Sequence, residues 1–211
     1  MAPGDRWDPA TLRLIAVTDS LRDGVEGLSA RVFAAVHGGA TMVQVRLPGE
    51  SAAVLCSVVK SIRSVVRVPV LVSERLDVAL AASADGVYLA LDDLSPEAVR
   101  RVAPRELLIG ASVSSDADVA RAAHADFVGI GPVYSSAGGV REAALGPDGF
   151  AELARRANRP AVAIGGIDDG NVAEVMRAGA SGIAVISALF GSSDPSARAR
   201  ALCRAQDASG T

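Results

Sequence analysis

Short apolar runs alternate along the whole chain with longer amphipathic stretches, and this alternation constrains the fold more than any other feature of the sequence. The runs have the length of strands and are mostly continuously hydrophobic, as in strands that are buried on both faces of a parallel sheet. Eight runs occur, at residues 12–17, 42–46, 69–73, 86–89, 107–111, 127–130, 161–165 and 182–186. The pattern predicts successive βα units.

The stretches that follow the runs are predicted to be helices, at residues 27–38, 51–66, 76–83, 95–103, 115–124, 147–157, 168–178 and 194–207. Several begin on residues that favour helix N-termini, namely Ser51, Ser95, Ser115 and Asp168. Eight units in 211 residues predict one α/β domain, a (β/α)8 TIM barrel over residues 1–211, with loose ends at 1–10 and 207–211. An open doubly wound sheet remains the alternative.

The composition, with 50% hydrophobic and 21% charged residues, is that of a soluble globular protein. A net charge of −3 and 3% aromatic residues offer neither a basic surface nor stacking groups for nucleic acid. No apolar run approaches the roughly 20 residues of a membrane span, and the N-terminus is too polar for a signal peptide. We expect a cytoplasmic protein that binds neither nucleic acid nor membranes; a homo-oligomer is possible.

Position in the predicted barrel excludes several kinds of chemistry, because barrel active sites lie at the C-terminal ends of the strands. His37 and His124 precede strands, and the only lysine, Lys60, lies inside a predicted helix. Schiff-base chemistry therefore lacks its nucleophile, and a zinc site of the usual ligands is not expected. Cys56 and Cys203 lie far apart in predicted helices and are expected to be buried thiols.

The residues left at the strand ends are oxygen ligands, arginine and backbone amides. Glu74, Asp92 and Asp93 suit Mg²⁺ beside a bound phosphate, although they can equally be solvated loop carboxylates. Arg46 ends a strand and can equally form a structural ion pair. The strand that ends at Gly165-Gly166, together with the next strand end, can present N–H groups to a phosphate. The longest connection, 132–146, is a candidate mobile loop over the site.

Nearly the whole chain resembles thiamine-phosphate synthase and the related TenI-type thiazole tautomerase, a family of (β/α)8 barrels. The matching segments are residues 43–46, 70–79, 84–89, 109–112, 128–133, 163–167 and 180–187, whose order and spacing are jointly specific. The resemblance implies a transferase of thiamine biosynthesis. Such an enzyme joins hydroxymethylpyrimidine pyrophosphate to thiazole phosphate and releases pyrophosphate, with Mg²⁺ as cofactor.

The resemblance also implies roles for individual residues. Gln44 would contact the pyrimidine, Arg46 and Ser112 would face the pyrophosphate as the catalytic residues, and Glu74 and Asp93 would bind the metal. The thiazole phosphate would be held by Gly165, Gly166, Ile186 and Ser187. Ser73 and Ser136 complete the predicted substrate-binding set.

The chain departs from the family pattern at two lysines that face the pyrophosphate, where it has Pro48 and Gly139. Arg75 or Arg141 can substitute for them, although a guanidinium is not equivalent to an ammonium. The histidine of the tautomerase branch is replaced by Ser114. Two alternatives stay open beside the synthase: a tautomerase-like enzyme, and a non-catalytic barrel that binds thiazole phosphate or thiamine phosphate.

Overall fold

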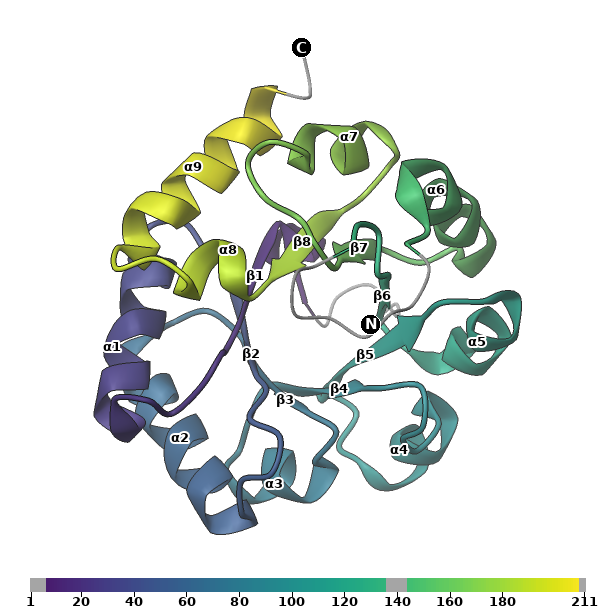
Figure 1. Ribbon diagram of the computed structural model, residues 1–211. Coiled ribbons are helices and arrows are strands. Elements are labelled where there is room, and N and C mark those ends of the chain that lie inside the picture. Colours follow the sequence, from purple (N-terminus) through teal and green to yellow (C-terminus); the bar gives the residue numbers. More distant parts are fainter. Residues whose placement is uncertain (1–6, 136–143, 209–211) are drawn as a thin grey trace.

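A computed structural model of the chain, which describes residues 7–135 and 144–208, is a closed barrel of parallel strands surrounded by helices (Figure 1). The strands are β1 (Leu14–Val17), β2 (Met42–Val45), β3 (Val70–Ser73), β4 (Gly86–Leu89), β5 (Leu108–Val113), β6 (Phe127–Ile130), β7 (Ala161–Ile164) and β8 (Gly182–Val185). Each strand pairs with the next one in the chain, and β8 pairs with β1. The predicted (β/α)8 barrel is confirmed, with strand ends within two residues of the expected ones, and the open sheet is wrong.

The α-helices are α1 (Gly24–His37), α2 (Ala52–Val65), α3 (Leu76–Ala81), α4 (Pro96–Val102), α5 (Asp116–Arg121), α6 (Gly146–Ala157), α7 (Val172–Arg177), α8 (Ser187–Phe190) and α9 (Pro195–Asp207). Two 3₁₀ helices are η1 (Pro9–Leu12) and η2 (Ala122–His124). The sequence missed α8 and η1, because one-turn helices are too short to show a helical period. Among the described helices, none is long and apolar enough to cross a membrane.

The predicted helix starts are confirmed at three serines and wrong at Asp168. The hydroxyls of Ser51, Ser95 and Ser115 each accept a hydrogen bond from a backbone N–H of the first turn. The Asp168 carboxylate instead accepts the N–H of Gly170 and so forms a turn, and α7 begins four residues later than expected. The β7–α7 connection is therefore longer than predicted, and it leaves the glycines after β7 outside the helix.

Two apolar layers stabilise the barrel, one between strands and helices and one inside the ring of strands. Alternate residues of each strand face the two layers: in β4, Val87 and Leu89 face the helices whereas Tyr88 lies inside. The interior is filled by Leu12, Ile15, Val17, Met42, Leu71, Tyr88, Leu108, Phe127, Val162 and Ala184. The barrel is thus a packed core, and only its ends are open to ligands.

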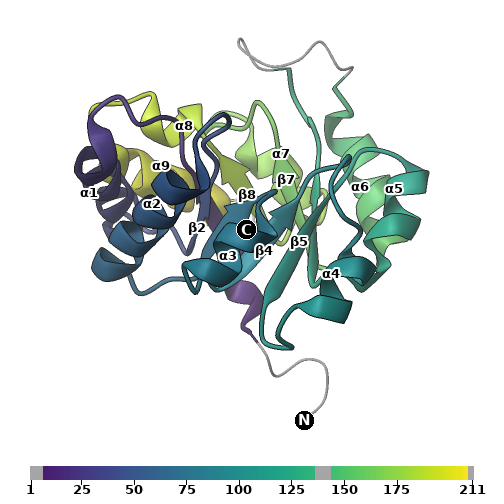
Figure 2. The same ribbon diagram turned by 90° about the horizontal axis from the view of Figure 1, so that it is seen from below.

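The N-terminal end of the barrel is closed by a segment that we expected to be loose. Leu12 of η1 is fully buried, and the Trp7 ring lies 6.1 Å from that of Phe127. Figure 2 shows this segment beneath the strands. The prediction of a loose end at 1–10 is therefore wrong for residues 7–10, and at the other end Asp207 belongs to α9 and pairs with Arg13. Residues 1–6 and 209–211 lie outside the described residues.

Both cysteines are free thiols, as expected, although each is half-buried rather than buried. The connection that we considered as a mobile loop is tied at its base, because Leu145 N–H and Gly146 N–H donate to the carbonyls of Pro132 and Val133. Residues 136–143, and with them Ser136, Gly139 and Arg141, lie outside the described residues. The predicted mobility of this loop stays a prediction.

Candidate functional site

The parallel strands bring the predicted site residues to one rim, because all their C-terminal ends open on the same face of the barrel. Arg46 follows β2, Glu74 follows β3, Asp93 lies in the loop after β4, and Ser112 lies in β5. The pairs Gly165-Gly166 and Ile186-Ser187 follow β7 and β8. By contrast, His37 and His124 end helices that lead back to the opposite face, and Lys60 lies in α2 on the outside of the barrel.

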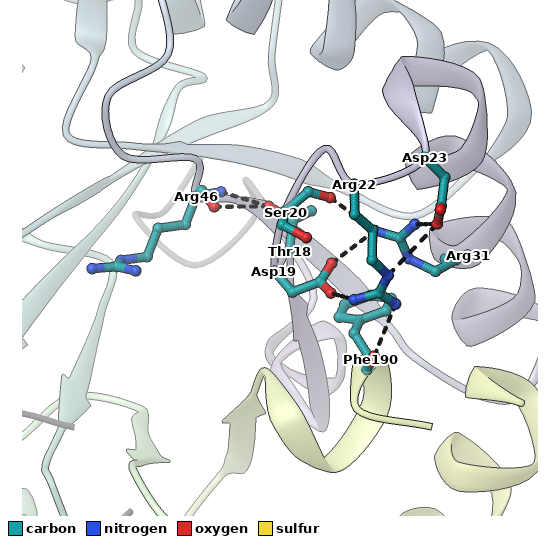
Figure 3. Close-up of polar contacts among 8 residues, drawn as sticks. All are labelled: Thr18, Asp19, Ser20, Arg22, Asp23, Arg31, Arg46 and Phe190. Atoms are coloured by element: carbon teal, nitrogen blue, oxygen red, sulfur yellow. Dashed lines mark hydrogen bonds and ion pairs between the residues drawn. The ribbon is translucent and has the colours of Figure 1, made fainter. Parts of the chain in front are cut away.

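Arg46 provides the exposed cation of this rim. Its backbone is fixed by the buried Thr18, whose Oγ1 accepts the Arg46 N–H at 2.9 Å and donates to the Arg46 carbonyl at 3.1 Å. The side chain extends away from the charged residues of the β1–α1 loop (Figure 3). Within residues 7–135 and 144–208 its guanidinium has no hydrogen-bond or ion-pair partner. The structural ion pair that the sequence left open is not found there.

Neutral polar groups form the floor of the site. The buried Gln44 donates from Nε2 to the Ser73 hydroxyl at 2.9 Å, and Ser112 donates from Oγ to the Tyr88 hydroxyl at 3.1 Å. Burial raises the pKa of Tyr88 to about 12, so this phenol is neutral. Gly129 leaves room for it, because a Cβ there would lie 2.1 Å from the phenol oxygen. We missed Tyr88 in the sequence, although the alternation of β4 places it inside.

Glu74 and Asp93 supply carboxylates from neighbouring strand ends. Glu74 is exposed and has a left-handed backbone, φ 67°, and its N–H donates to the Tyr88 carbonyl at 2.8 Å. Asp93 accepts the Ala90 N–H on Oδ2 at 2.7 Å, and its Oδ1 has no hydrogen-bond partner among the described residues. No group of three or more His, Cys, Asp or Glu residues in the described part of the chain could hold a metal ion. A cation here would take two carboxylates at most and complete its shell with substrate and water.

Arg75 does not provide a second unpaired cation. Its guanidinium makes two hydrogen bonds to the Asp77 carboxylate, of 2.8 and 2.6 Å, at the start of α3. The prediction that Arg75 substitutes for a missing lysine is therefore not supported by its contacts. Arg141, the other candidate, lies outside the described residues.

The glycines after β7 can present backbone N–H groups to an anion. Gly165 and Gly166 have φ values of 93° and 64°, which favour glycine. A Cβ on Gly166 would lie 2.6 Å from the Tyr134 carbonyl oxygen, so the position also requires glycine for close packing. The Gly166 carbonyl accepts a hydrogen bond from Asn171 Nδ2 at 2.9 Å, and this side chain fixes the turn.

The one-turn helix α8 lies beside these glycines in the ring and begins with the exposed Ser187. The N–H groups of a first helical turn have no intrahelical partner, and the N–H groups of Ser187 and Ala188 donate to no other described residue. Backbone N–H groups at such a position favour negatively charged oxygens. This part of the rim can bind a phosphate without a lysine or arginine.

Taken together, the described part of the rim combines a guanidinium without a hydrogen-bond or ion-pair partner, that of Arg46, with two carboxylates, exposed N–H groups and neutral hydroxyls. Ser114, which stands at the slot of the tautomerase histidine, is held by Asp118, since its N–H and its hydroxyl both bond to Oδ2 at 3.0 Å. Burial raises the pKa of Asp118, but hydrogen bonds from Ser115 and Ser114 lower it below its usual value. The site is suited to stabilising a departing anion and poorly suited to moving protons at carbon.

Comparisons with known proteins agree with this arrangement. A family model described as thiamine monophosphate synthase matches residues 14–189, from β1 into α8. The thiamine-phosphate synthase of Xanthobacter autotrophicus is 38% identical over 204 residues, which cover 92% of this chain and 95% of that protein. The one of Chloroflexus aurantiacus is 40% identical over 195 residues, which cover 90% of each chain.

A solved structure extends the likeness to three dimensions. The thiamine phosphate pyrophosphorylase from Pyrococcus furiosus superposes with a TM-score of 0.85 at 33% sequence identity. The match covers 95% of this chain and 98% of that one. The similarity therefore spans the barrel and all the strand ends that form the rim.

Proposed function

The chain belongs to the thiamine monophosphate synthase family, and we propose on this premise that it joins hydroxymethylpyrimidine pyrophosphate to thiazole phosphate in thiamine biosynthesis. The observation that carries the proposal is the guanidinium of Arg46, which has no partner among the described residues and shares a rim with Glu74 and Asp93. Such a rim suits a pyrophosphate leaving group. We place the reaction in the cytoplasm, where its small anionic substrates would be found.

The proposed reaction is a substitution at the methylene carbon of the pyrimidine. The bond from this carbon to the pyrophosphate oxygen breaks, and the pair of electrons leaves with pyrophosphate. The thiazole nitrogen then supplies the electron pair of the new carbon–nitrogen bond, so thiamine phosphate and pyrophosphate are the products. Negative charge grows on the leaving oxygens, and Arg46 is the side chain that would stabilise it.

The polar floor would hold the pyrimidine. Gln44 uses its Nε2 for Ser73, which leaves its carbonyl oxygen to accept a hydrogen bond from the amino group of the ring. Ser112 would donate toward the pyrophosphate when it releases Tyr88. Because the Tyr88 phenol stays neutral, it adds no negative charge beneath the anion.

Mg²⁺ is the cofactor that we propose for this site. Glu74 and Asp93 would hold it, and one or two carboxylates plus phosphate oxygens and water are the ligand set that this ion usually takes. When bound, the ion neutralises charge on the pyrophosphate. Since Pro48 and Gly139 replace the two lysines, we expect turnover to depend on the ion more steeply than in an enzyme that keeps them.

The thiazole phosphate would bind at the opposite part of the rim, against the N–H groups of Gly166, Ser187 and Ala188. Ile186 is 38% exposed and would contact the apolar part of the thiazole. This division separates the two anions: a cation and a metal hold the group that leaves, and neutral amides hold the group that stays.

The test is release of pyrophosphate from the two substrates, measured with and without Mg²⁺. We expect release only when both substrates and the ion are present. Isomerisation of a thiazole without metal would support the tautomerase, and tight binding of thiamine phosphate without any release would support the non-catalytic barrel. Either result would contradict the proposal.

A further inference from the structure

The hydroxyl of Thr18 replaces a backbone hydrogen bond between β1 and β2, because it bonds to the backbone of Arg46 just beyond the end of β2. The Thr18 N–H donates to the Gln44 carbonyl at 3.0 Å, which is the last such bond from β1. The next residue of the rim, Arg46, is held by the Thr18 side chain instead, through both its N–H and its carbonyl. Thr18 is 1% exposed, so the side chain that makes these contacts is buried.

The loop that carries Thr18 is itself fixed by a compact group of charges (Figure 3). Arg31 of α1 pairs with Asp19 at 2.9 Å and with Asp23, and it donates to the Ser20 carbonyl at 2.8 Å. The side chains of Arg31 and Asp19 are only 13% and 15% exposed. Burial raises the pKa of Asp19, but the hydrogen bond and charge of Arg31 outweigh this effect, and the net pKa lies below its usual value. The pair is therefore ionised at neutral pH.

The same loop reaches the phosphate side of the rim. Arg22 pairs with Asp19 and donates from its second terminal nitrogen to the carbonyl of Phe190, the last residue of α8, at 3.1 Å. A cation at the C-terminus of a helix satisfies carbonyl groups that lack an intrahelical partner. The β1–α1 loop is thus bonded to Arg46 on one side and to α8 on the other.

We propose that Thr18 is a positioning residue for Arg46, and that the segment 18–23 sets the position of this cation relative to α8. The inference rests on the proposed function, because it takes Arg46 as the pyrophosphate-binding side chain. A guanidinium on a long side chain acts on a leaving group only where its backbone is held in place, and a shift of about 1 Å can cost up to about 100-fold in rate. Thr18 supplies this restraint through the backbone of Arg46.

The test compares Thr18→Val, which removes the hydroxyl at constant shape, with Thr18→Ser, which keeps it. Binding of inorganic pyrophosphate at fixed Mg²⁺ is measured by calorimetry, and kcat and KM are measured for the pyrophosphate substrate. We expect Thr18→Val to weaken pyrophosphate binding and to lower kcat/KM by about tenfold, and Thr18→Ser to stay within about twofold. Affinity for thiazole phosphate should not change.

Thr41 provides a matched control at the other end of the barrel. Its hydroxyl also joins β1 to β2, since it accepts the Leu14 N–H at 3.0 Å and donates to the Thr11 carbonyl at 2.8 Å. Thr41→Val should lower stability as Thr18→Val does and leave pyrophosphate binding unchanged. An equal loss of binding in the two variants would overturn the inference, because a general loosening of the barrel would then explain both.

A double-mutant cycle separates this inference from the proposed function. In an Arg46→Ala background Thr18→Val should have no further effect on pyrophosphate binding, whereas a second tenfold loss would show that Thr18 acts independently. If Arg46→Ala alone leaves binding unchanged, the assignment of Arg46 fails instead. Should Thr18→Val not fold, Thr18→Ala also removes the hydroxyl and should weaken pyrophosphate binding in the same way, and unchanged binding would contradict the inference. The 47% exposed Arg22 tests the link to α8. Arg22→Met should weaken thiazole phosphate binding about threefold through α8, and unchanged binding would contradict the link.

Discussion

The two ends of the barrel are built from the same strands but treat their polar groups in opposite ways. At the N-terminal end, Asp85 and Asp126 each stand just before a strand and accept the N–H of a neighbouring strand at 2.8 Å. Each also pairs with an arginine, Arg63 or Arg100. The charged side chains of Asp85 and Asp126 therefore hold strands and helices together.

At the C-terminal end, polar groups are held by their backbones, and several of their side chains remain unpaired. Arg46 has no side-chain partner in the described part of the chain, and Glu74 is exposed in a left-handed conformation. The N–H groups of Ser187 and Ala188 are likewise not used by other described residues. The difference agrees with the general division of this fold, in which the N-terminal face contributes stability and the C-terminal face carries the functional site.

The largest expected effect is the loss of activity caused by Arg46→Ala. This variant tests whether the C-terminal end contributes to function and not to stability. Loss of the only unpaired cation among the described rim residues should lower kcat/KM for the pyrophosphate substrate by about 100- to 1,000-fold. The free energy of unfolding in urea should change by less than about 0.5 kcal/mol.

Arg67→Ala is the matched control, because Arg67 is an exposed arginine at the N-terminal end whose Nη1 bonds only to the adjacent Val66 carbonyl in the described structure. This variant should keep full activity. An equal fall in thiazole phosphate affinity after Arg46→Ala would contradict the assigned role.

Asp126→Ala should have the opposite effect to Arg46→Ala, a loss of stability without a loss of activity. The Asp126 carboxylate is 10% exposed and faces Arg100, which is 18% exposed, so removing it leaves a buried charge and a strand N–H without this partner. We expect a loss of about 3 kcal/mol in the free energy of unfolding, with kcat/KM unchanged at temperatures where the variant is folded. Asp77→Ala breaks a pair that is 39% and 63% exposed and screened by solvent, and should cost much less. Similar losses in the two variants would show that burial does not decide the cost.

Glu74→Gly tests whether the C-terminal end keeps a carboxylate for Mg²⁺ at the expense of a strained, left-handed backbone. Glycine relieves the left-handed conformation and should raise the free energy of unfolding by up to about 1 kcal/mol, while Mg²⁺-dependent turnover falls with the lost carboxylate. Ser83, with φ 54° after α3, is the matched position at the other end, and Ser83→Gly should stabilise without loss of turnover. A Glu74→Gly variant that keeps its Mg²⁺ dependence would remove Glu74 from the metal site.

The smallest effect concerns pH. Hydrogen bonds and the charges of Arg31 and Arg22 outweigh burial and hold the pKa of Asp19 below 3.8. Asp19 therefore adds stability that is complete above the pKa of the unfolded chain, and this stability is lost as the pH falls through the lower folded pKa. Urea unfolding between about pH 6 and pH 2 should show a smaller loss on acidification in Asp19→Asn than in the parent chain. An unchanged slope would mean that Asp19 does not contribute to acid unfolding.

Local patterns in the sequence predicted the strands well because burial is nearly continuous along each strand. The hydrophobic runs located all the strands to within two residues, and the serine caps located three helix starts. The positions of His37, His124 and Lys60 away from the rim also followed from the order of the elements. These features depend on residues that are close together in the chain.

The sequence by itself determined the barrel and, through it, which residues share the C-terminal rim. Only the tertiary structure decided that residues 7–12 close the barrel, that Tyr88 joins the floor and that Thr18 holds Arg46. The physical reason is that a hydrogen bond between Thr18 and Arg46 joins residues 28 positions apart. No local period records such a contact, because it exists only after the ring of strands has closed.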